Sequence, residues 1–152
     1  MRVIVLSIHS SFADKIYSGE KRFEYRKRLA SNPVDYLVLY ETKPVAAITG
    51  FVEVVGKLSG SKKELWNATK RDAGITRAFF YDYFSESKCG ACAYHLGKVF
   101  KTNSPMSLSD IGLSSAPQSF RYIDEGVFLA LLDVSQCVFK PDGQLVPCSE
   151  ND

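Results

Sequence analysis

The sequence predicts an α+β fold, a mixed β-barrel of about five or six strands with short flanking helices. Three observations lead to this class. Most regular segments are short runs rich in Val, Ile, Leu, Tyr and Phe, as strands are. The helical patterns are few and short. Strand and helix patterns do not alternate through the middle of the chain, which argues against a doubly wound α/β fold.

The N-terminal part predicts a strand followed by a short helix. Residues 2–8 are rich in Val, Ile and Leu, which favours a buried strand. Apolar side chains then recur at helical spacing over residues 11–18, and Ser10 with Ser11 offers an N-cap. Gly19 is typical of the residue that follows the last helical turn. We therefore expect free backbone N–H groups at the start of this helix, where they can face an anion.

Three further strands are expected next along the chain. Residues 23–28 alternate charged and aromatic side chains, and residues 35–40 read as a well-buried strand. Residues 45–55 form a long β-rich run in which Gly50 predicts a bend or a bulge. These segments complete the first four strands of the predicted barrel.

The rest of the chain predicts two helices and then two strands. Ser61 and Glu64 form a capping-box pattern that marks the start of a helix. A helical apolar stripe over residues 77–84 predicts a second helix, and we interpret its aromatic side chains as core. Residues 91–100 and 127–134 are predicted as strands because both are largely apolar.

Length and composition indicate a single domain. The chain has 152 residues, of which 45% are hydrophobic and 24% charged, as is usual for a globular protein. We expect the domain to span residues 1–137 and a polar tail to span residues 138–152. No apolar run approaches the ~20 residues that cross a bilayer, and the first run is too short for a signal peptide. We therefore expect a cytoplasmic protein without a membrane partner.

The net charge of +2 hides an asymmetry along the chain. Residues 1–101 carry a net charge of +7, whereas residues 102–152 carry −5. An anionic partner would therefore meet the first two thirds of the chain.

Four cysteines in a chain of this length do not indicate a disulfide scaffold. Cys89 and Cys92 form a CxxC pair, with His95 three residues later. A zinc site would need a fourth ligand, which Cys137 or Cys148 would have to supply. The simpler interpretation places Cys92 in a strand and Cys89 in the turn before it. We expect no metal and no cofactor.

The densest chemical feature lies over residues 18–28, where five basic residues and two carboxylates occupy eleven positions. One acid among three guanidiniums suits a polar anionic ligand better than a core. Lys21 stands at the start of this strand. The alternative is a purely structural ion pair between Glu24 and Arg26. In a strand, one face would carry Arg22, Glu24, Arg26 and Arg28, and the other Phe23 and Tyr25.

Two further features are candidate binding elements. Residues 117–122 offer an amide, a hydroxyl, a guanidinium and an aromatic ring, a mixture that suits a base or a phosphate. The alternative is a loop that packs Phe120 inward and exposes Arg121. His9 lies between the first strand and the first helix, where the mouth of a barrel would be, and its alternative role is that of a polar loop residue. The polar groups of 117–122 belong to Gln118, Ser119, Arg121 and Tyr122.

The order of these features resembles the ASCH domain family, which has a PUA-like fold. The family signature is roughly G-x-K-x-x-E-x-R, and it matches Gly19, Lys21, Glu24 and Arg26 position by position. The resemblance extends over roughly residues 3–134 and points to a branch regarded as transcriptional regulators. The additional matches are Pro44, Val45, Glu64, Leu65, Trp66, Phe80, Tyr83, Phe84 and residues 117–122.

The resemblance implies a cleft, lined by a Lys–Glu–Arg set, that binds RNA or a nucleotide-like ligand, with a regulatory role. The alternative is a hydrolase on a modified nucleoside or RNA, an amidohydrolase or a ribonuclease, with Lys21, Glu24 and Arg26 as catalytic residues. The branch that deacylates cytidine derivatives has Thr where this chain has Glu24, and a carboxylate does not replace a hydroxyl nucleophile. Binding is therefore favoured and catalysis is left open. The expected ligand-binding residues are Lys21, Glu24, Arg26, Arg28, His9, Gln118, Ser119, Arg121 and Tyr122.

Overall fold

A curled six-stranded sheet forms the centre of the computed structural model, which describes residues 1–88, 90–135, 137–139 and 144–147. The strand order is β2-β5-β4-β3-β1-β6. β1 and β3 are parallel, and the other neighbouring strands are antiparallel. This mixed half-barrel confirms the predicted α+β class. The strands are β1 (Val3–Ile8), β2 (Phe23–Arg26), β3 (Tyr36–Glu41), β4 (Ala47–Gly60), β5 (Ala91–Met106) and β6 (Phe120–Ile123).

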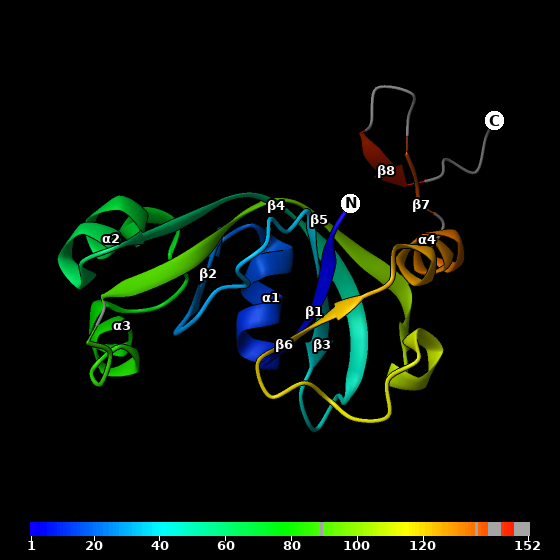
Figure 1. Ribbon diagram of the computed structural model, residues 1–152, viewed down its shortest axis with the longest axis horizontal. Coiled ribbons are helices and arrows are strands. Elements are labelled where there is room, and N and C mark those ends of the chain that lie inside the picture. Colours follow the sequence, from blue (N-terminus) through cyan, green and yellow to red (C-terminus); the bar gives the residue numbers. More distant parts are fainter. Residues whose placement is uncertain (89, 136, 140–143, 148–152) are drawn as a thin grey trace.

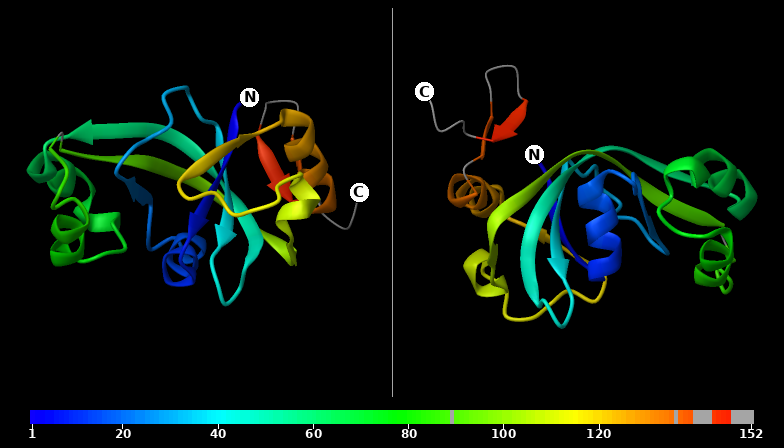
Figure 2. Two further views of the ribbon diagram at one scale, coloured as in Figure 1. Left: turned by 60° about the horizontal axis from the view of Figure 1, so that its bottom comes forward. Right: turned by 180° about the vertical axis from the view of Figure 1, so that it is seen from behind.

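Helices lie at both ends of the long β4–β5 ribbon and against its middle. α2 and α3 lie at one end, α4 lies at the other, and α1 lies between them (Figures 1 and 2). The described residues between β4 and β5 form the end of the molecule that carries α2 and α3. The helices are α1 (Ser10–Ser18), α2 (Lys62–Thr69), α3 (Arg77–Tyr83) and α4 (Glu125–Val134), with 3₁₀ turns η1 (Lys70–Asp72) and η2 (Leu108–Ile111).

Three apolar clusters follow this arrangement. One packs α4 against the sheet through Phe128, which contacts the Phe51 and Tyr36 rings. A second packs α1 against the other face of the sheet through Ala13 and Ile16. The third joins β2 to α2 and α3. The third cluster fixes the helical end of the molecule against β2, the strand that carries the signature residues.

Several boundaries agree with the sequence predictions. α1 ends at Gly19, whose φ of 85° is the left-handed conformation expected after a last turn. Ser61 caps α2, with its hydroxyl accepting a hydrogen bond from the Glu64 N–H at 3.1 Å. The register of β4 shifts between Ile48 and Gly50, which confirms the predicted bulge.

Residues 127–134 are helical, so the strand predicted there is wrong. Asp124 caps this helix by accepting from the Gly126 N–H at 2.8 Å. Phe128, Leu131 and Leu132 are buried on one helical face, and the Leu- and Ala-rich stretch favours a helix. A short apolar run does not by itself distinguish a buried helix from a buried strand.

Two predictions on the remaining elements are also corrected. The N-cap of α1 is His9, not Ser10 or Ser11, because the helix follows directly after β1 and the His9 carbonyl accepts from Phe12 and Ala13. β6 was not predicted. It is an edge strand that pairs with β1 alone, so it shows no strong apolar alternation.

Part of the predicted C-terminal tail is ordered into strands β7 (Cys137–Phe139) and β8 (Leu145–Pro147), which pair antiparallel. Leu145 is buried in the cluster that contains α4. Residues 136, 140–143 and 148–152 lie outside the described residues, and the domain boundary at 137 stays a prediction. Cys92 lies in β5 as expected, whereas Cys89 and Cys148 lie outside the described part. None of the described helices is long and apolar enough to cross a membrane.

Candidate functional site

A pocket of about 380 Å³ opens where the start of α1, strand β2 and helix α3 meet. This volume falls within the ~300–1,000 Å³ typical of small-molecule sites. β1 ends at the pocket and α1 begins there, so the chain turns at its edge. The signature residues Lys21, Glu24 and Arg26 all line it. The alternation of β2 puts Glu24 and Arg26 on one face, whereas Lys21 reaches the pocket from the residues before the strand.

Lys21 is almost completely buried, with 3% of its surface exposed. Its ammonium donates a hydrogen bond to the Ala73 carbonyl at 2.8 Å. It also lies 4.8 Å from the centre of the Tyr25 ring and 5.6 Å from that of Phe12, within cation–π range. Burial lowers the pKa of Lys21 from its ordinary value, and the nearby Glu24 carboxylate opposes this shift.

Gly74 shapes the turn that receives the Lys21 ammonium. Its φ of +66° is left-handed, and a Cβ at this position would lie 2.6 Å from Lys21 Cβ. Lys15 donates to the Gly74 carbonyl at 3.0 Å. The two lysines thus bind the successive carbonyls of Ala73 and Gly74, and this fixes the turn against α1 and β2.

Glu24 and Arg26 form an ion pair at the pocket. Arg26 Nε donates to Glu24 Oε1 at 3.2 Å, and Arg26 Nη2 donates to the Ser7 carbonyl at 2.6 Å. Glu24 is 6% exposed. Its second oxygen, Oε2, is buried and has no hydrogen-bond partner among the described residues. Only one of the two carboxylate oxygens therefore has a hydrogen-bond partner among the described residues, which is uncommon for a buried charged group.

Tyr25 also lines the pocket, and its ring supports the pocket floor beside Lys21. Its hydroxyl donates to Thr69 Oγ1 at 2.7 Å, and Thr69 donates in turn to the Leu65 carbonyl at 2.8 Å. Burial raises the pKa of Tyr25 to about 12. This chain of hydrogen bonds ties β2 to α2 and holds the ring in place beside Lys21.

Aromatic side chains form the wall of the pocket. Phe12 of α1 contacts Phe79 of α3 edge-to-face at 5.5 Å, and Tyr83 stacks near Phe79 at 6.5 Å. Phe79 is 45% exposed, whereas Phe80 and Phe84 of the same helix are fully buried. The interpretation of this stripe as core was therefore wrong for Phe79, whereas Tyr83 packs against the third cluster and also lines the pocket.

His9 and Gln118 lie at the rim, where two of the predicted residues join the signature set. His9 Nδ1 lies 3.4 Å from the hydroxyl of Thr42, and the His9 ring contacts Phe12. The Ser7 hydroxyl donates to the Pro117 carbonyl at 2.6 Å, which holds the segment before β6 at the rim. Ser7 and Thr42 were not predicted, because isolated hydroxyl residues carry no sequence signal.

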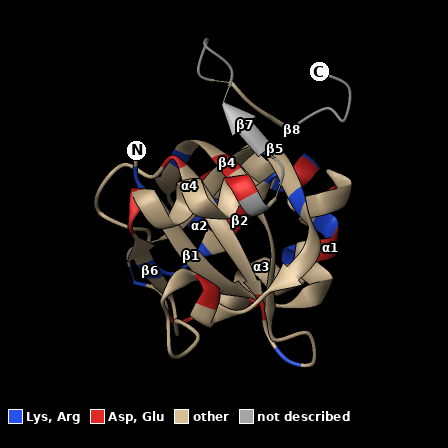
Figure 3. Cartoon of the chain, turned by 90° about the vertical axis from the view of Figure 1, so that its right-hand side faces the viewer, with Lys and Arg blue, Asp and Glu red and all other residues tan. Residues whose placement is uncertain are grey.

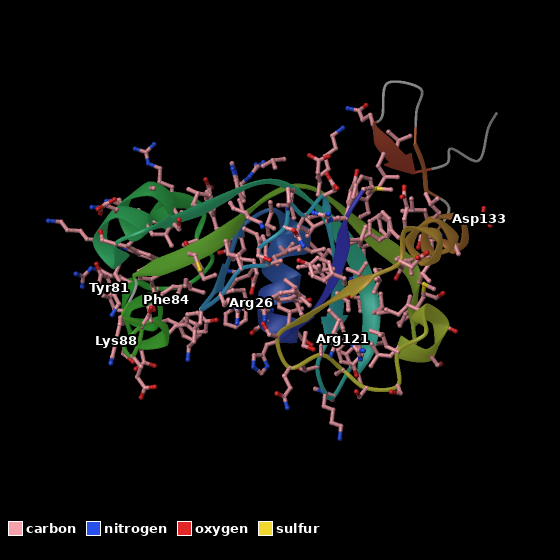
Figure 4. The ribbon with its side chains drawn as sticks, viewed as in Figure 1. Arg26, Tyr81, Phe84, Lys88, Arg121 and Asp133 are labelled. Atoms are coloured by element: carbon pink, nitrogen blue, oxygen red, sulfur yellow. The ribbon has the colours of Figure 1, made fainter. Side chains whose placement is uncertain are left out.

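The structure places four other predicted residues outside the pocket lining. Arg28 follows β2, which ends at Arg26, and its side chain is exposed. Ser119 is exposed just before β6, and Arg121 and Tyr122 are exposed on it. Arg121 lies on β6, apart from Arg26, in Figure 4. The roles of these four residues stay predictions.

Both charge signs occur on the side of the molecule that carries α4. In Figure 3, which faces that side, Lys and Arg are interspersed with Asp and Glu. Buried Lys21 and partly buried Arg26 belong instead to the pocket at β2.

The fold and the pocket together define a class: a curled half-barrel of the PUA-like type with a polar pocket beside its second strand. The model of the ASCH domain matches residues 6–105. The chain therefore belongs to the ASCH domain family, as the signature indicated.

Three relatives illustrate the likeness. The chain is 31% identical over 81 residues to the ASCH domain-containing ribonuclease of Zymomonas mobilis. This alignment covers 53% of this chain and 55% of that protein. It is 26% identical over 123 residues to ATP synthase subunit alpha of Ureaplasma parvum. This alignment covers 80% of this chain and 15% of that subunit. The chain thus spans about half or less of these curated relatives. The crystal structure of ASCH from Zymomonas mobilis aligns with a TM-score of 0.78 and 26% identity, over 87% of this chain and 94% of that one.

Proposed function

We propose that this ASCH domain binds single-stranded RNA and holds one nucleotide in the pocket. The observation that carries the proposal is the convergence of the Lys21, Glu24 and Arg26 side chains with four Phe and Tyr rings in one pocket. A relative of 31% identity is named a ribonuclease, so its substrate class is RNA. The regulatory role implied by the resemblance stays a prediction within this proposal.

The pocket suits an unstacked nucleotide. Phe12, Phe79 and Tyr83 offer ring faces and edges for a base, and base–aromatic stacking is the usual way in which proteins hold single-stranded RNA. Phosphates would then stay at the solvent side, near the exposed Lys27 and Arg28 that follow Arg26. A base inside a duplex does not reach such a pocket, which is why the proposal specifies single strands.

Replacing Phe79 with alanine tests the stacking wall. We expect Phe79→Ala to weaken binding of a short single-stranded RNA by about 5- to 150-fold, since stacking contributes ~1–3 kcal/mol per base. Fluorescence anisotropy with a labelled oligonucleotide measures the affinity. Wild-type affinity should also fall as salt concentration rises, because phosphate contacts release counterions.

Leu129→Ala is the matched control, because Leu129 is 44% exposed and lies on α4 at the other end of the molecule. This variant should bind as wild type does. No RNA binding by the wild type at low salt, or binding without salt dependence, would contradict the proposal.

A second candidate function is hydrolysis, which the named ribonuclease relative favours. Lys21, with its pKa lowered by burial, would act as a base or an electrostatic stabiliser. Glu24 would be the general acid or base, and Arg26 would stabilise developing negative charge. Oε2 of Glu24, which has no hydrogen-bond partner within the part of the chain that the structure describes, gives this candidate a proton acceptor.

The hydrolytic candidate predicts that Lys21→Met lowers the rate of single-stranded RNA cleavage by about 10²- to 10⁴-fold, the usual contribution of a general acid or base. Gel analysis of a labelled RNA gives the rate. Lys15→Met is the control, since Lys15 contacts the same turn from outside the pocket lining. Equal cleavage by wild type and Lys21→Met, or none by either, removes this candidate.

A further inference from the structure

We infer that Glu24 reads an amino group on the base that occupies the pocket, so that adenine, cytosine or guanine is preferred to uracil. The inference rests on the proposed function. It adds that the base, rather than the phosphate, is the part of the nucleotide that enters the pocket first. Its basis is the unequal hydrogen bonding of the two Glu24 oxygens. Oε1 accepts from Arg26, and Oε2 is buried without a partner among the described residues.

A buried carboxylate oxygen without a partner requires a hydrogen-bond donor from elsewhere. In the structure neither neighbouring cation donates to Oε2: Arg26 donates to Oε1 and to the Ser7 carbonyl, and the Lys21 ammonium donates to the Ala73 carbonyl. The side chain of Glu24 lines the pocket, and the terminal torsion of a glutamate is soft. A small rotation of the carboxylate therefore brings Oε2 to a donor on the ligand.

The carboxylate also decides which end of a nucleotide reaches the floor. A phosphate would place negative charge beside Glu24 within a buried site, which is unfavourable. A base edge carries N–H donors instead, and the acceptance of an amino N–H by Glu is an established base contact. The aromatic wall formed by Phe12, Phe79 and Tyr83 suits the faces of the same base.

The groups beside Glu24 separate the amino-bearing bases from uracil. Lys21 and Arg26 each retain N–H groups beyond the hydrogen bonds described above, and these can bind the ring nitrogen or carbonyl next to an amino group. Uracil has one N–H on its pairing edge, between two carbonyl oxygens. A uracil edge turned toward Glu24 would bring both carbonyl oxygens near the carboxylate.

Calorimetric titration with AMP, CMP, GMP and UMP tests the inference on wild type, Glu24→Gln and Glu20→Gln. Glu20 is an exposed carboxylate next to Lys21 and is the matched control. Wild type and Glu20→Gln should bind UMP about 5- to 150-fold more weakly than the best amino-bearing nucleotide, the range of a specific base contact. Glu24→Gln should lose this preference, because an amide donates as readily as it accepts.

The outcomes separate the inference from the proposed function. Equal wild-type affinity for all four nucleotides, together with salt-dependent RNA binding, overturns the inference and leaves the proposed function standing. A preference that Glu24→Gln retains also overturns it. If wild type binds neither the nucleotides nor RNA, both fail. The wild-type comparison needs no variant, so it decides the inference even if Glu24→Gln does not fold.

Discussion

Lys21→Met should abolish most RNA binding while leaving the protein nearly as stable as wild type. Lys21 carries its charge in a site that is 3% exposed, and the loss of a buried charged contact to a ligand typically weakens binding by on the order of 30-fold or more. Methionine retains the unbranched apolar stem. We expect the free energy of unfolding to change by less than about 1 kcal/mol, well below the 2–5 kcal/mol of a core truncation.

The small effect on stability follows from the cost of burying the ammonium. Desolvation is the largest influence on Lys21 and lowers its pKa from 10.5. Between the lowered pKa and 10.5, the unfolded chain binds more protons than the folded one, so stability contributed by this residue rises with pH. Below the lowered pKa, both states are protonated and the cost of burial is fully present.

Urea denaturation of wild type and Lys21→Met over a range of alkaline pH measures this effect. The stability of wild type relative to the variant should increase as pH rises through the lowered pKa toward 10.5. A relative stability of wild type that falls with pH would contradict the burial argument.

Gly74→Ala is the substitution expected to damage fold and site together. A Cβ at Gly74 would lie 2.6 Å from Lys21 Cβ and 2.8 Å from its Cγ. These atoms are close to the backbone and have little freedom to move away. We expect a loss of about 2–5 kcal/mol of stability, from ~1–2 for a left-handed alanine and ~1–3 for overpacking. RNA affinity should fall as well, because the Lys21 stem is displaced.

Gly112→Ala separates these two contributions. Gly112 has a similar φ of +76°, but no atom lies within 4 Å of the position its Cβ would take. This variant should lose only the ~1–2 kcal/mol of the backbone term and should bind RNA as wild type does. Urea denaturation measures the loss of unfolding free energy for both variants. Equal losses would contradict the prediction, because they would mean that the contact between the new Cβ at position 74 and Lys21 is relieved at little cost.

The charged part of the candidate site was predictable because strand alternation is local. Glu24 and Arg26 are two residues apart in β2, so any strand places them on one face, and Lys21 precedes it. The aromatic wall was not predictable. Phe79 and Tyr83 belong to a helix whose side chains are aromatic on several sides, and only the packing of Phe80 and Phe84 against β2 shows which rings remain free.

The fold was predicted best where a local signal sets an element boundary. The end of α1 was marked correctly by Gly19, the start of α2 by Ser61 and the bulge in β4 by Gly50. β6 and α4 depend instead on long-range packing. β6 exists because it pairs with β1, more than a hundred residues earlier in the chain, and α4 because the sheet offers an apolar face to Phe128.

The placement of residues 61–90 between β4 and β5 has an evolutionary consequence. Gly60 pairs directly with Ala91, so the ladder closes at that point whatever the length of the connection. Mutation can therefore replace α2 and α3, and with them Phe79 and Tyr83, without shifting the register of the sheet. The part of the wall that α3 supplies is free to diversify among descendants, whereas Phe12 stays on α1 and Glu24 and Arg26 remain on a strand of the sheet.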